Sequence, residues 1–230
     1  MGMNYLKEFE MFLASINLGQ YRTRYKPIKI VEMDLDRNIQ ALDIIYKLYW
    51  NEKHFLDFDD FYSAYLSEYE VELEVFRNKI FMCKDCFYKG LPARIYRTWA
   101  SLITQIQAGY VAEVVFGAKS VNMKTELDRK GIDIQIIYKT QVINLQVKKE
   151  SLSREVRQGK KIKQSDVIIY DLPYNVPNDQ VFKNPKKISG EFRKPYLDFM
   201  SNTNLRRLDN GFVIFTINYF VKIKKELCGE

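Results

Sequence analysis

The sequence predicts an α/β fold, with a mixed central sheet flanked by helices and a mainly helical N-terminal portion. Apolar residues recur every three or four positions, which is the spacing of amphipathic helices, in residues 3–18, 36–81 and 93–116. Short β-branched runs follow after residue 130 and are typical of strands. At 230 residues and 47% hydrophobic, the chain can bury one substantial core. We therefore expect a single domain over 1–230, with 1–92 mainly helical and 93–230 carrying the sheet.

The helix expected at 93–116 has an apolar stripe that should pack into the core, formed by Ile95, Trp99, Leu102, Ile103 and Ile106. Gly109 should break or bend this helix before Glu113. Farther along, residues 166–171 (DVIIYD) and 211–217 (GFVIFTI) predict strands. Between them, residues 173–195 contain four prolines and predict a long irregular loop.

Residues 129–150 (RKGIDIQIIYKTQVINLQVKKE) predict an antiparallel hairpin, because two β-branched runs are joined by a short polar break at 139–141. If the chain folds about that break, facing positions have numbers that sum to roughly 280. Asp133 then lies beside Val147 and Lys148. Gln146 and Lys148 share one face of the sheet, while the apolar residues that alternate with them face the core.

An acid, a carboxamide and an amine at one sheet edge are typical of a metal-dependent phosphodiesterase, and their spacing is that of the PD-(D/E)xK nucleases. Asp133 is the expected ligand of a divalent ion, and Gln146 can offer only a neutral carbonyl. Lys148 is expected to stabilise charge on the phosphate and to orient or deprotonate the attacking water. A second carboxylate is needed, and we expect Glu113, with Glu126 or Glu150 as the alternatives. The same short pattern also fits a turn-flanking acid and a solvated lysine.

Longer blocks resemble the TaqI type of restriction endonuclease, and they follow in order over nearly the whole chain. They are residues 8–35 (EFEMFLASINLGQYRTRYKPIKIVEMDL), 89–117 (KGLPARIYRTWASLITQIQAGYVAEVVFG), 126–133 (ELDRKGID), 146–161 (QVKKESLSREVRQGKK) and 210–216 (NGFVIFT). The resemblance implies a restriction-endonuclease-like fold with the catalytic core and DNA-contacting elements in 93–230. It also implies a Mg²⁺-dependent endonuclease that acts as a homodimer on a short palindrome, in the type case TCGA cut after the T. A cognate DNA methyltransferase is then expected in the same host.

Residue by residue, the catalytic motif of that family carries over to Asp133 and Lys148, and Gln146 matches the family's own departure from an acid. Two alternatives stay open. A structure-selective nuclease such as a junction resolvase would share the site without reading bases. A catalytically inactive DNA-binding protein would have lost the metal, although retention of Asp133 and Lys148 argues against it.

The net charge of +7 favours an anionic partner, here double-stranded DNA. The densest basic stretch directly follows the expected site. Candidate DNA contacts are the basic residues of that stretch and of three other segments, Lys149, Arg154, Arg157, Lys160, Lys161, Lys163, Arg94, Arg97, Lys186, Lys187, Arg193, Arg206 and Arg207. Phosphate contact is expected to be commoner among them than base readout.

Other chemistries have little support in the sequence. A zinc site at Cys83 and Cys86 would need two more ligands, so we expect free thiols in a reducing compartment. His54 is the only histidine and has no nucleophile motif beside it, which argues against a serine-hydrolase triad. No apolar run is long enough to cross a membrane, and the N-terminus does not read as a signal peptide. We expect a cytoplasmic protein.

Overall fold

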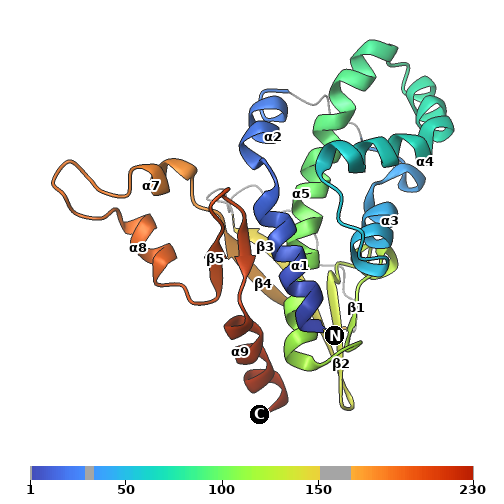
Figure 1. Ribbon diagram of the computed structural model, residues 1–230. Coiled ribbons are helices and arrows are strands. Elements are labelled where there is room, and N and C mark those ends of the chain that lie inside the picture. Colours follow the sequence, from blue (N-terminus) through green and yellow to red (C-terminus); the bar gives the residue numbers. More distant parts are fainter. Residues whose placement is uncertain (1, 29–33, 151–166, 230) are drawn as a thin grey trace.

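The computed structural model describes residues 2–28, 34–150 and 167–229 (Figure 1). Its N-terminal part is helical, as predicted, and consists of α1 (Gly2–Ser15), α2 (Leu18–Tyr25), the 3₁₀ turn η1 (Arg37–Ile39), α3 (Leu42–Ile45), the π-helical η2 (Tyr46–Asn51) and α4 (Phe58–Lys79). The rest contains α5 (Lys84–Phe116), β1 (Val121–Asn122), α6 (Thr125–Asp128), β2 (Ile134–Tyr138), β3 (Gln141–Glu150), β4 (Ile169–Asn175), α7 (Asp179–Lys183), α8 (Lys194–Met200), β5 (Leu205–Arg207), β6 (Val213–Phe215) and α9 (Ile217–Cys228). No helix of the described residues has the length and apolarity that a membrane span needs.

The main sheet is mixed and has the order β1-β2-β3-β4, which confirms the predicted α/β class. Strands β1, β2 and β3 pair antiparallel, and β4 pairs with β3 in parallel. In the β2–β3 hairpin Ile134 faces Leu145 and Tyr138 faces Gln141, one position from the predicted register. Lys139 takes a positive φ of 52° in the tight turn between the strands. The residues that face α5, such as Ile143 and Leu145, are buried.

Helix α5 is the central support of the molecule, because it packs against α1, α9 and strands β1 and β2 (Figure 1). It starts nine residues earlier than the predicted position 93, since the Cys83 sulfur caps it by accepting a hydrogen bond from the Cys86 amide at 3.1 Å. The expectation that Gly109 breaks the helix is wrong, for α5 continues to Phe116. A Cβ at Gly109 would lie 2.2 Å from the Met123 sulfur, so the glycine serves close packing instead.

The predicted apolar stripe of α5 is buried, and it meets an aromatic core from the N-terminal helices. Trp99 is fully buried and donates from Nε1 to the Tyr49 hydroxyl at 2.8 Å. Tyr65, also fully buried, donates to the Ile39 carbonyl at 2.7 Å. Burial of each of these rings contributes about 3 kcal/mol to the stability of the folded state, and the polar atom of each ring retains a hydrogen bond. The core thus fixes α5 relative to η2, and α4 relative to the segment that precedes α3.

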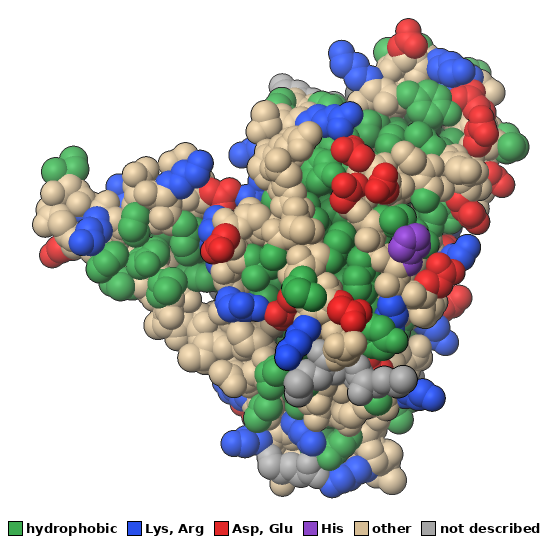
Figure 2. Space-filling view, viewed as in Figure 1, with side chains coloured by type: hydrophobic (Ala, Val, Ile, Leu, Met, Phe, Trp, Pro, Cys, Tyr) green, Lys and Arg blue, Asp and Glu red, His purple; other side chains and the backbone are tan. Residues whose placement is uncertain are grey.

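An arm formed by α7, α8 and their connection projects from the body, and hydrophobic side chains gather along it (Figures 1 and 2). The prediction of an irregular loop over 173–195 is therefore wrong in part. Asn178 caps α7 by accepting from the Gln180 amide, and Pro195 occupies the first turn of α8, where its missing N–H costs nothing. Pro173 lies in β4 at the edge of the described sheet, where a strand tolerates proline.

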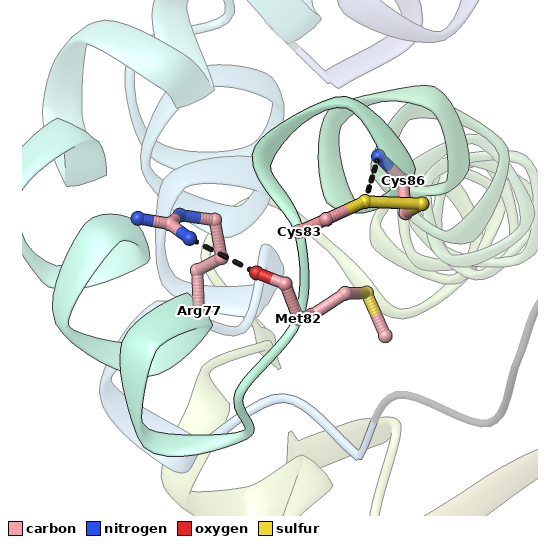
Figure 3. Close-up of a disulfide and its surroundings, with 4 residues drawn as sticks. All are labelled: Arg77, Met82, Cys83 and Cys86. Carbon is pink, nitrogen blue, oxygen red and sulfur yellow. Dashed lines mark hydrogen bonds between the residues drawn. A yellow bond between two sulfur atoms is a disulfide. The ribbon is translucent and has the colours of Figure 1, made fainter.

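Cys83 and Cys86 form a disulfide at the start of α5, so the expectation of free thiols at these two positions is wrong (Figure 3). The first turn of the helix places their Cα atoms 5.3 Å apart, within the span of a disulfide. Arg77 donates to the Met82 carbonyl beside it at 2.9 Å and joins the end of α4 to this turn. Cys228, near the C-terminal end of the chain, is a free cysteine.

Candidate active site

A cavity of about 590 Å³ lies between α5, the segment from Leu35 to Leu42 and the adjoining ends of β2 and β3. Polar side chains from three elements line it, and they include Asp128, Asp133, Gln146, Arg94, Arg97, Ser101 and Gln105. The hairpin thus brings two of the predicted site residues, Asp133 and Gln146, to one wall. The helix supplies the opposite wall.

Asp133 directly precedes β2 and is only 5% exposed. Its backbone amide donates to the Leu145 carbonyl at 2.9 Å, and its carboxylate accepts from the Val147 amide at 2.7 Å. The predicted proximity to Val147 is confirmed. Burial raises the pKa of Asp133 to about 7, and the charge of Asp128 adds to this shift; the Val147 amide and Lys148 oppose it. Asp133 is therefore a buried carboxyl group whose negative charge is only partly compensated by the groups around it.

Asp128 is the acid that accompanies Asp133, and the sequence analysis missed it. It ends α6, lines the same cavity and accepts a hydrogen bond from the Tyr46 hydroxyl at 2.9 Å. Burial raises its pKa, while the bond from Tyr46 and the charge of Arg129 counteract that effect. Gly131 reverses the chain after α6 with φ 82°, which returns the backbone toward the hairpin. The signal in the sequence is the pair of acids around a glycine in 126–133 (ELDRKGID).

Lys148 lies two residues after Gln146 on β3, and its ammonium is 2.6 Å from the carboxylate of Asp171 on β4. Asp171 faces Gln146 in the parallel register, so the acid, the amide and the amine share one face of the sheet. Both partners of the ion pair are about half exposed, with 46% for Lys148 and 55% for Asp171. The lysine is therefore accessible to a substrate, and Asp171 is a second acid that the sequence analysis did not single out.

Glu113 is not among the residues that line this cavity. It lies near the end of α5, where its carboxylate accepts from the Lys119 amide at 2.9 Å and its charge acts on Lys53. It lies about two turns beyond Gln105, the last residue of α5 that lines the cavity. Glu126 is exposed, and the side chain of Glu150 is outside the described residues. In residues 2–28, 34–150 and 167–229 no three or more His, Cys, Asp or Glu side chains form a ready metal cluster.

The predicted DNA contacts other than Lys149 fall into four groups. Arg94 and Arg97 line the cavity, where Arg94 donates to the Thr98 hydroxyl at 2.8 Å and Arg97 to the Ile28 carbonyl at 3.2 Å. Other arginines are engaged within the protein, since Arg206 pairs with Glu10, Arg207 pairs with Asp179, and Arg193 donates to the Asn184 carbonyl. Lys186 and Lys187 are exposed on the arm. Arg154, Arg157, Lys160, Lys161 and Lys163 lie outside the described residues.

Two carboxylates and an amide line one cavity with arginines on its far wall, an arrangement typical of one class of protein, the nucleases that hydrolyse phosphodiesters with a metal ion. Comparison with known proteins narrows this class. The family model for the TaqI restriction endonuclease matches residues 6–227. The chain belongs to this family, and the predicted enzyme class, a type II restriction endonuclease, is confirmed.

Two relatives support the assignment. The type II restriction enzyme TthHB8I of Thermus thermophilus is 32% identical over 93% of this chain and 84% of its own length. The type II restriction enzyme TaqI of Thermus aquaticus is 32% identical over 95% of this chain and 86% of its own length. No solved structure gave a significant match.

Proposed function

We propose that this enzyme hydrolyses both strands of a short palindromic DNA site in the presence of Mg²⁺, with TCGA as the first sequence to test. One observation carries the proposal: Asp128 and Asp133 line a single cavity at the end of the hairpin that carries Gln146 and Lys148. The choice of TCGA follows from the family resemblance. Symmetric cutting of a palindrome is most simply performed by a two-fold homodimer, so we propose that state as well.

The residues of the cavity fit a hard divalent cation. Asp128, Asp133 and the amide oxygen of Gln146 are oxygen donors of the kind that Mg²⁺ prefers. The pKa values of both acids are raised by burial, and a bound cation would offset the charge that these carboxylates carry in a poorly solvated site. Asp128 thus takes the role expected of Glu113. When bound, the ion would neutralise charge on the scissile phosphate and acidify a nearby water.

Residues of the chain itself orient the catalytic groups and neutralise the charge of the phosphate. The Val147 amide fixes the direction of the Asp133 carboxylate, so that its free oxygen remains available to the cavity. Asp171 holds the Lys148 ammonium at the strand, on the face of the sheet that Gln146 also occupies. From there Lys148 can donate hydrogen bonds to a phosphate oxygen or to the attacking water as negative charge develops. Arg94 and Arg97 on the opposite wall suit flanking phosphates.

Cleavage of a defined plasmid, with and without EDTA, tests the proposal. Discrete fragments in Mg²⁺ are expected from the wild-type enzyme, and sequencing of their ends gives the site and the cut position. Lys148→Ala should lower the rate about 100- to 1,000-fold, the usual effect of removing one donor to the transition state. Lys222→Ala, at an exposed lysine of α9 that pairs with Glu226, is the matched control. Preference for branched DNA would favour a resolvase, and a gel shift without cutting would favour an inactive binder.

The identity of the second acid has its own test. Asp128→Asn should raise the Mg²⁺ concentration needed for the half-maximal rate, because it removes one of two anionic donors from the cavity. Glu113→Gln should leave that concentration near the wild-type value, since Glu113 is bound to the turn after α5. The opposite pattern would restore Glu113 and remove Asp128 from the metal site.

The remaining proposals follow from the same assignment. A restriction enzyme endangers the DNA of its own cell, so a methyltransferase that protects the same site is the expected partner gene. Genome location next to such a gene, and protection of the site in host DNA, would support the pairing. A cytoplasmic location, where the host DNA and any invading DNA are both accessible, fits this activity.

A further inference from the structure

A second cavity, of about 440 Å³, lies between α2, α5, the ends of β3 and β4, and the start of β6. Four cationic side chains line it, Arg22, Lys26, Arg97 and Lys149. Among the described residues that line it, Asp179 is the only carboxylate. Three buried tyrosine rings, Tyr25, Tyr96 and Tyr174, form much of the remaining wall. The cavity thus carries an excess of positive charge.

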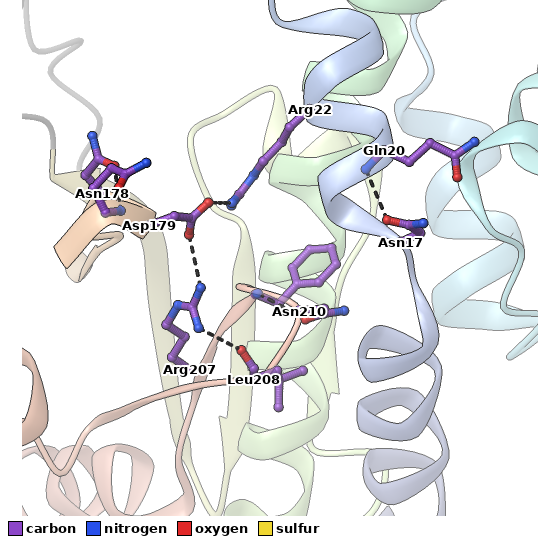
Figure 4. Close-up of polar contacts among 10 residues, drawn as sticks. Asn17, Gln20, Arg22, Asn178, Asp179, Arg207, Leu208 and Asn210 are labelled. Carbon is purple, nitrogen blue, oxygen red and sulfur yellow. Dashed lines mark hydrogen bonds and ion pairs between the residues drawn. The ribbon is translucent and has the colours of Figure 1, made fainter. Parts of the chain in front are cut away.

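The single carboxylate is shared between two arginines (Figure 4). Asp179 pairs with Arg22 and accepts from Arg207 at 3.1 Å, and Arg207 in turn stacks over Phe182 at 4.5 Å. Burial alone would raise the pKa of Asp179, but the bonds and charges of the two arginines lower it overall. Because one negative charge serves two guanidinium groups, the charge of Arg22 is only partly neutralised.

The backbone is shaped to hold this cluster. Gly211 has a positive φ of 96°, and a Cβ there would lie 3.3 Å from both the Arg22 guanidinium and the Asp179 carboxylate. It would also lie 3.1 Å from Arg207. A side chain at this position would therefore crowd the ion cluster, besides straining the backbone. The ion pair with Asp179 therefore holds Arg22 at the cavity wall.

Lys149 supplies a cation from the opposite wall. It follows Lys148 on β3 and lies beside Tyr174 in the parallel register. The side chain as a whole is exposed, yet partial burial of its ammonium lowers the pKa of Lys149, and the charge of Arg22 lowers it further. Repulsion between cations around one cavity destabilises the empty site. A bound anion would reverse that effect.

We propose that this cavity binds a phosphate group of the DNA backbone outside the position of cleavage. The inference rests on the proposed function and deepens it by adding Arg22 and Lys26 to the DNA contacts. Arg97 lines both cavities, and β3 contributes to both, with Gln146 and Val147 at the first and Lys149 at the second. Val147 and Lys149 are two residues apart and so lie on the same face of the strand, about 7 Å from each other. DNA bound at the first cavity therefore has further phosphates within reach of the second.

The test measures binding of a 20-base-pair duplex in EDTA, with and without TCGA, over a range of salt concentrations. In the double variant Lys26→Ala/Lys149→Ala we expect roughly tenfold weaker binding to both duplexes, because charged hydrogen bonds to one phosphate are lost. The slope of log K against log salt should flatten by about 0.9, the value for one phosphate contact. The control is Lys222→Ala/Lys225→Ala, which removes two lysines of α9 and should leave the slope unchanged. Lys149→Arg, which keeps the charge, should retain the wild-type slope.

Three results would overturn the proposal. An unchanged slope in the double variant would remove the cavity from the DNA path. A larger loss on the TCGA duplex than on the other would make these lysines base readers. Stabilisation of the wild type, but not of the double variant, by inorganic pyrophosphate, without any change in DNA binding, would assign the cavity to a free anion. Because binding is measured without Mg²⁺, a protein that never cuts a plasmid would refute the proposed function and still leave this test decisive.

Discussion

Asp133→Asn should stabilise the metal-free protein, although it removes a proposed metal ligand. The pKa of Asp133 rises from its usual 3.8 to about 7 in the folded state, mainly because the group is buried and faces Asp128. A shift of about 3 units, at 1.36 kcal/mol each, corresponds to about 4 kcal/mol as an upper limit. Asparagine keeps the shape of the side chain and an oxygen that can accept from the Val147 amide, so it removes the charge alone.

The effect depends on pH with a definite sign. A carboxyl whose folded pKa is raised favours the folded state fully below its unfolded pKa, and that stability is lost as pH rises through the folded value. In EDTA the advantage of Asp133→Asn should therefore be about 2 kcal/mol at pH 5 and should grow to about 4 kcal/mol above pH 7. Urea unfolding at pH 5 and pH 8 measures it, with Asp209→Asn, at an exposed carboxylate, as the control. Equal stabilities at pH 8, or an advantage that does not change with pH, would refute the reasoning.

Three further changes test the packing and the ion cluster. Gly109→Ala should destabilise the protein by about 1–3 kcal/mol in thermal unfolding, since its Cβ meets Met123; an unchanged melting temperature would show that Met123 moves aside at no cost. Gln105→Met should stabilise the folded protein by about 1 kcal/mol in the same assay, because the buried side-chain amide oxygen of Gln105 accepts no hydrogen bond from the described residues. A loss of stability would contradict this reasoning. Asp179→Asn should reduce stability at pH 7, and the difference should shrink as pH falls below about 4, because the folded pKa of Asp179 is lowered from 3.8 and its contribution is lost as pH falls through the folded value; a pH-independent difference would point to packing instead.

The hairpin was predictable because its information is local. Alternating β-branched residues and a short polar break determine the register, and the register alone places Asp133 against Val147. The long helix was equally clear from its apolar stripe, but its start was not, because a cysteine caps α5 and the first turns carry few apolar residues. The two helices of the arm were hidden by prolines, which terminate most helices yet are tolerated in a first turn.

Asp128 and Asp171 could not be predicted from local sequence patterns. Asp128 reaches Asp133 only because Gly131 reverses the chain, and nothing in the spacing of two acids specifies that turn. Asp171 reaches Lys148 through a parallel pairing of β3 with β4, which depends on how the chain crosses between them. Glu113 lies on the helix that lines the cavity, but about two turns separate it from Gln105, the last residue of α5 at the cavity wall. Only the three-dimensional arrangement distinguishes the acids that reach the cavity from those that do not.

Helix α5 lines both cavities, with Arg94, Ser101 and Gln105 at one, and Tyr96 and Thr104 at the other. This shared wall limits how the enzyme can evolve. Each residue of an α-helix turns by about 100°, so a single insertion or deletion between Arg94 and Gln105 would rotate one end of the helix relative to the other and misalign the two sites together. Changes of length should therefore be confined to the connections at either end of α5. Among natural variants of this enzyme, the interval from Arg94 to Gln105 should keep a constant number of residues even where its residue types differ.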